Sequence, residues 1–131
     1  MIEFAAMSPS CYICVDIEAS GPNPHDYSML SLGAATVDIP RRSFYAELKP
    51  TNMQESVGTA SIHGLSLDKL AADGEEPKAA LERFEAWLKT VREGDKELVF
   101  VAFNAPFDWM FVSDYFYRFL GRNPFGYKAL D

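Results

Sequence analysis

Several patterns that define common protein classes are missing from this sequence. No apolar run reaches the roughly 18 residues that a membrane span requires, so a membrane partner is excluded. The N-terminus lacks a basic segment followed by an apolar one, which predicts a cytoplasmic location. Basic residues are outnumbered, with 12 Lys and Arg against 19 Asp and Glu, so a coat protein that holds nucleic acid by a basic surface is disfavoured. An enzyme that meets phosphates through metal ions remains compatible with this acidity.

Cysteine and histidine are scarce, with 2 residues of each type. Cys11 and Cys14 have the spacing of zinc and redox pairs, but no second pair or nearby histidine completes a tetrahedral site. Because positions three apart in a strand face opposite sides, shared ligation by the two thiols is hindered. We therefore expect buried, reduced cysteines that carry no chemistry.

What the sequence does contain is a series of short apolar segments separated by turns. The 131 residues are 48% hydrophobic and 24% charged, which predicts one globular domain. We expect residues 1–10 to be a leader or a disordered N-terminus, and residues 11–131 to form the domain. The patterns predict strands at 11–18, 29–38, 43–48 and 98–103, and helices that begin at Pro77 and Pro106.

The order of these elements predicts an α/β fold. The short link between the second and third strands favours antiparallel pairing, so the first three strands form an antiparallel meander. The helix that follows allows a crossover, which places the fourth strand parallel to the first. That fourth segment is apolar without alternation, which is typical of a central strand covered on both faces. The prediction is a mixed sheet in which the meander is followed by a helix, a strand and a helix.

Two carboxylates stand at the end of the first strand. Asp16 and Glu18 project to the same face, about 7 Å apart along the backbone, and neither has a basic neighbour in sequence. A bound divalent cation would compensate their repulsion, whereas an exposed strand end would leave both acids solvated. Asp108 falls in the first turn of the last helix, where an acid is also a common helix-start preference. If the first and fourth strands are adjacent, the three acids converge at one sheet edge, which favours the cation.

The acidic segments resemble motifs of a known family. Residues 16–21, Asp-Ile-Glu-Ala-Ser-Gly, resemble the first motif of the DEDD 3′–5′ exonuclease superfamily, which has a ribonuclease H-like fold. Residues 104–108, Asn-Ala-Pro-Phe-Asp, resemble its second motif, and residues 61–65, Ser-Ile-His-Gly-Leu, are similar to the loop between the two. The resemblance implies a two-metal hydrolase that acts at the 3′ end of single-stranded DNA or RNA and releases a nucleotide monophosphate.

The resemblance also assigns roles to individual residues. It implies that Asp16, Glu18 and Asp108 are catalytic and hold two Mg²⁺ or Mn²⁺ ions. It further implies contacts to the terminal nucleotide from Ala19, Ser20, Gly21, His63, Asn104 and Phe107. The other aromatic residues of the region fit core packing better than base stacking: Phe103, Trp109 and Tyr115.

The chain departs from the family at the third motif, which carries a His or Tyr followed by a fourth Asp. No His occurs after His63, and its spacing to Asp68 is a chance match in the wrong loop, so the general base stays unassigned. We expect a fold that lacks the last strand and helix, with an unpaired edge on strand four that favours a homodimer. We also expect little nuclease activity from this chain alone.

Two other functions are left open by the residues. One is a non-catalytic domain that binds nucleic acid or a protein partner with the same fold. The other is a structural α/β domain with incidental acids, for which Asp16→Ala would raise stability by relieving repulsion.

Overall fold

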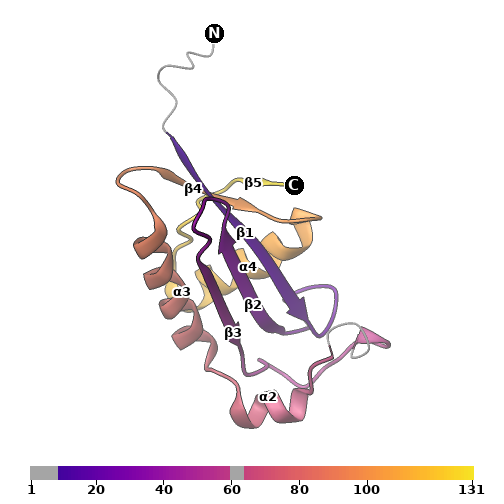
Figure 1. The fold of residues 1–131 in the computed structure, drawn as a ribbon. Coiled ribbons are helices and arrows are strands. Elements are labelled where there is room, and N and C mark those ends of the chain that lie inside the picture. Colours follow the sequence, from indigo (N-terminus) through magenta and orange to yellow (C-terminus); the bar gives the residue numbers. More distant parts are fainter. Residues whose placement is uncertain (1–8, 60–63) are drawn as a thin grey trace.

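A five-stranded mixed sheet forms the centre of the computed structural model, which describes residues 9–59 and 64–131 (Figure 1). The strand order is β3-β2-β1-β4-β5. Antiparallel pairing joins β1 (Ser10–Ala19) to β2 (Met29–Thr36), and β2 to β3 (Ser43–Glu47). Strand β4 (Glu97–Val101) runs parallel to β1. The predicted meander and crossover are both confirmed.

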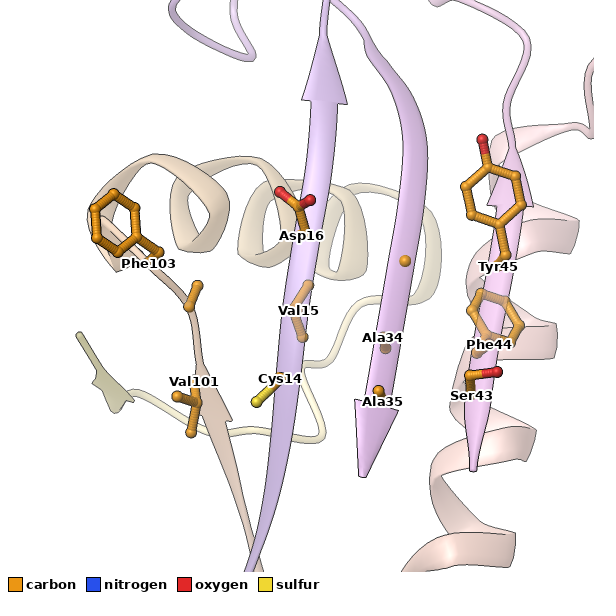
Figure 2. Close-up of a pocket in the computed structure, with 12 residues that line it drawn as sticks. Cys14, Val15, Asp16, Ala34, Ala35, Ser43, Phe44, Tyr45, Val101 and Phe103 are labelled. Atoms are coloured by element: carbon orange, nitrogen blue, oxygen red, sulfur yellow. The ribbon is translucent and has the colours of Figure 1, made fainter. Parts of the chain in front are cut away.

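The two long helices pack on one face of the sheet. Helix α3 (Pro77–Val91) connects β3 to β4, and α4 (Ala105–Leu120) follows β4; both lie behind the sheet in the view of Figure 2. In β1, Ile13, Val15 and Ile17 are buried on the helix side, because side chains alternate along a strand. Short helix α2 (Leu67–Asp73) was not predicted, because only two leucines, Leu67 and Leu70, mark its buried side. Among the described residues, every helix is too short or too polar to cross a lipid bilayer.

An aromatic cluster fills the space between the sheet and the two long helices. Phe84 on α3 is fully buried at its centre. Its ring lies 5.0 to 6.2 Å, between centroids, from four other rings: Phe44, Trp87, Phe116 and Phe125. This cluster joins β3, α3 and α4, so it fixes the two helices against the sheet.

Among residues 9–59 and 64–131, no helix packs on the other face of the sheet, which corrects two predictions. Strand β4 is not covered on both faces: Leu98 and Phe100 are buried, whereas Val99 and Val101 are partly exposed. An apolar run cannot distinguish these cases, because valine is compatible with a half-open face. The cysteines do face opposite sides, but Cys14 is exposed rather than buried, since it lies on the helix-free face.

A fifth strand is also present, in contrast to the expectation that it is absent. Residues Ala129–Leu130 form β5 and pair in parallel with Phe100 and Val101 of β4. The outer edge of β4 is therefore partly paired. A two-residue strand carries too little periodicity to be recognised from sequence.

Candidate active site

The predicted carboxylates lie where β1 extends past the end of β4. The pairing of β1 with β4 ends at Cys14 and Val101, so within the described part of the chain no strand pairs with the last residues of β1 on that side. Asp16 is exposed on the helix-free face, as Figure 2 shows, and the half-buried Glu18 follows two positions later on the same face. Because β4 ends at Val101, the edge of β1 beside Asp16 and Glu18 is not paired with β4.

Asp108 approaches the same strand from α4. It lies in the first turn of the helix, as predicted, and only 5% of its surface is exposed. The Ile17 backbone N–H donates a 2.9 Å hydrogen bond to Asp108 Oδ1. Ile17 stands between Asp16 and Glu18, so this bond brings the third carboxylate to the backbone between the other two. The helix packs on the opposite face, but the side chain reaches the strand edge that β4 leaves open.

The surroundings of Asp108 disfavour its ionised form. Burial is the main factor that raises the pKa of Asp108 above its usual range. The hydrogen bond from Ile17 opposes this increase, whereas the charges of Asp16 and Glu18 add to it. A cation at this edge would favour the ionised form of Asp108 and reverse the balance.

The donor set fits a hard divalent cation in its chemistry. Carboxylate oxygens are the ligands that Mg²⁺ and Mn²⁺ prefer. Among residues 9–59 and 64–131, however, no three Asp, Glu, His or Cys side chains are arranged closely enough to hold a metal. Asp16, Glu18 and Asp108 would hold an ion only after their side chains turn toward a common point.

The loop after Glu18 is tightly held by its own hydrogen bonds. Ala19 and Ser20 are buried, and Ser20 Oγ accepts a 2.9 Å bond from the Ser28 N–H. The Ser56 N–H donates to the Ser20 carbonyl at 2.8 Å. The predicted contacts of this loop to a nucleotide therefore stay a prediction, in which the loop would act through its fixed backbone.

Gly21 lies against the ring of Tyr27. A Cβ atom added at Gly21 would lie 2.2 Å from Tyr27 Cγ. Gly21→Ala is therefore expected to destabilise the chain by about 1–3 kcal/mol, because ring and backbone must separate. Urea unfolding would measure the loss. Adding Tyr27→Ala should recover most of it, and an equal loss in the double variant would contradict the clash.

The remaining predicted site residues occupy different environments. Asn104 has a left-handed backbone, with φ 57°, and its side chain forms no cap bond to α4. Phe107 is half-buried and packs edge-on against Phe111. His63 lies outside the described residues. The other histidine, His25, is exposed, and its Nε2 lies 3.8 Å from Asp26 Oδ1.

A hollow on the open face was missed by sequence reasoning. It has a volume of about 460 Å³ and contains Asp16 among its lining residues. Small side chains such as Cys14 and Ala35 lie between the rings of Tyr45 and Phe103, as Figure 2 shows. Phe103 is 99% exposed, so its predicted place in the core is wrong. The available signal was its position directly before Asn104-Ala105-Pro106, where the strand pattern ends.

The chain is similar to known proteins in sequence and in fold. No protein-family model matches the chain. Escherichia coli 3′–5′ DNA exonuclease Cap18 is 45% identical over 120 residues, which cover 92% of this chain and 64% of that protein. The chain thus spans less than two thirds of this relative.

Solved structures of exonuclease I share the fold. The apo form superimposes with a TM-score of 0.74 at 20% identity, over 94% of this chain and 29% of that one. E. coli exonuclease I with a dA16 oligonucleotide gives a TM-score of 0.74 at 20% identity, over 93% and 27%. These findings confirm the resemblance to 3′–5′ exonucleases and the α/β, ribonuclease H-like fold.

Proposed function

We propose that residues 11–131 are part of a metal-dependent exonuclease that hydrolyses phosphodiester bonds from the 3′ end of single-stranded nucleic acid. The observation that supports the proposal is the hydrogen bond from Ile17 to Asp108, because it brings the Asp108 carboxylate to the β1 backbone between Asp16 and Glu18. The 45% identical relative is named a 3′–5′ DNA exonuclease, which supports DNA as the first substrate to test. The fold shared with oligonucleotide-bound exonuclease I supports a single strand as ligand.

Each site residue has a role in this proposal. Asp16, Glu18 and Asp108 would hold two Mg²⁺ or Mn²⁺ ions. When bound, such ions lower the pKa of a water molecule and stabilise the leaving 3′ oxygen. The Ile17 N–H holds Asp108 at the β1 backbone between the other two acids, as an outer partner that orients a ligand. Ala19, Ser20, Gly21, Asn104 and Phe107 would orient the terminal nucleotide.

The structure does not test several of the predictions made from the sequence. The general base is unassigned, because His25 is solvated and His63 is outside the described residues. Weak activity of the isolated chain, a homodimer and a cytoplasmic location stay predictions. The partial pairing of β4 with β5 removes part of the original reason for a homodimer.

Asp16→Asn is expected to weaken Mn²⁺ binding by about 100-fold or more, because loss of an outer-shell partner alone costs about 10–100-fold. Calorimetric titration of the whole chain measures this directly. Asp95→Asn is the matched control. Asp95 is an exposed acid that precedes β4, so it lies at the end of this strand away from Asp16. Release of nucleotide monophosphate from a 3′-labelled single strand should fall in parallel.

The alternative, a binding domain without catalysis, makes a different prediction. It has no reason to bind Mn²⁺ through Asp16, so equal Mn²⁺ affinities of the parent chain and Asp16→Asn would contradict our proposal. Single-strand binding that persists with no release in Mn²⁺ would favour the alternative.

A further inference from the structure

Asp131 contacts the start of the helix that carries Asp108. The Ala105 N–H donates a 3.0 Å hydrogen bond to Asp131 Oδ1, across 26 positions in sequence. Ala105 is the first residue of α4. Its N–H is one of the donors that a helix start leaves without an intrahelical partner.

The N-cap side chain does not serve this N–H, because an N-cap side chain accepts from the N2 or N3 N–H rather than from N1. Asn104 is at the cap position, and its side chain forms no cap bond. Asp131 supplies an acceptor for the Ala105 N–H from outside the helix. A carboxylate at this place is also favoured by the positive end of the helix dipole.

The sheet holds Asp131 in position. Leu130 pairs with Val101 in the β4–β5 ladder, and its carbonyl accepts a 3.1 Å bond from the Ala102 N–H. Asp131 follows directly, so its side chain is anchored to the end of β4. The C-terminal end of β4 is therefore connected to the start of α4 through Asp131.

We propose that Asp131 is a positioning residue for Asp108. Ala105 and Asp108 are three residues apart, which is nearly one helical turn, so fixing the first sets the place of the second. With Asp131 on Ala105 and Asp108 on Ile17, the first turn of α4 is held at both ends. Without Asp131, the turn frays and the bond between Asp108 and Ile17 opens more often. The consequence for metal binding rests on the proposed function; the positioning does not.

Amide hydrogen exchange of Ile17 tests the positioning directly in the whole, metal-free chain. Asp131→Ala should speed Ile17 exchange about fivefold, the factor that corresponds to loss of a typical cap. Asp131→Asn keeps the accepting oxygen, so it should restore the parent rate. Leu32, in the centre of the sheet, reports global unfolding and is compared in each variant.

Gly121→Ala is the matched control for lost helix stability. Gly121 ends α4 with a φ of 75°, where an alanine is strained, and lies far from Ala105 along the helix. It should change Ile17 and Leu32 exchange equally. In Asp131→Ala, Ile17 should change more than Leu32.

The outcomes separate the two proposals. Unchanged Ile17 exchange in Asp131→Ala, or an Asp131→Asn variant that behaves like Asp131→Ala, overturns the positioning role. If Ile17 responds as expected and Mn²⁺ affinity falls about fivefold with it, the role in the metal site is supported. If Ile17 responds but the parent chain binds no Mn²⁺, the positioning stands and the proposed function fails.

Discussion

Asp108→Asn, kept free of metal by a chelator, is expected to be more stable at neutral pH than the parent chain. Burial, and after it the charges of Asp16 and Glu18, raise the pKa of Asp108, so its ionised form is penalised in the fold. Asparagine removes the charge but keeps an oxygen that can accept the Ile17 hydrogen bond. The same change should weaken Mn²⁺ binding by about 100-fold or more, since a ligand is lost.

The sign of the pH dependence follows from the raised pKa. Below the pKa of the unfolded chain, Asp108 is protonated in both states and carries no penalty. As the pH rises through the folded pKa, the buried carboxyl of Asp108 must ionise in the native state. The stability that the protonated carboxyl gave relative to the unfolded chain is then lost. Thermal unfolding from about pH 4 to about pH 8 should therefore show the advantage of Asp108→Asn growing with pH.

Asp108→Ala is the control for the hydrogen bond. It also removes the charge but leaves the Ile17 N–H without its acceptor, so it should be less stable than Asp108→Asn. A metal-free Asp108→Asn that is less stable than the parent at neutral pH would show that the carboxylate is compensated. Unchanged Mn²⁺ binding in this variant would remove Asp108 from the proposed site.

Phe84→Ala is expected to destabilise the chain by about 3–5 kcal/mol, the usual cost of removing a buried phenylalanine. The ring is fully buried and contacts aromatic rings from β3, from α4 and from the segment after α4. Partial collapse of the cavity cannot replace contacts to so many elements. Urea unfolding followed by circular dichroism measures the change in the free energy of unfolding.

Phe103→Ala is the matched control, with the same substitution at an exposed position. Because Phe103 is 99% exposed, its loss should change stability by no more than about 0.5 kcal/mol. A large cost at Phe103 with a small one at Phe84 would contradict the described core. If Phe103→Ala leaves stability unchanged but weakens binding of a single-stranded oligonucleotide, the hollow beside Asp16 takes part in substrate contact.

Local patterns in the sequence determined much of the fold. The alternation of buried and exposed residues in β1 follows from its period of two, which also placed Asp16 and Glu18 on one face. Proline near each long helix start and Gly121 at the end of α4 marked the helix boundaries. The order of elements, with a helix before β4, was sufficient for the parallel crossover. The resemblance to exonucleases comes from short motifs at residues 16–21 and 104–108.

Only the tertiary structure decided how these parts meet. Whether β4 is covered on one face or two depends on which elements pack there, and an apolar run does not contain that information. The pairing of β1 with β4 ends before Ile17, so the Ile17 N–H can donate its hydrogen bond to Asp108, 91 positions away. The cap from Asp131 likewise joins residues 26 positions apart. Such contacts arise when separate elements pack together, whereas sequence periodicity reports only the burial of each element by itself.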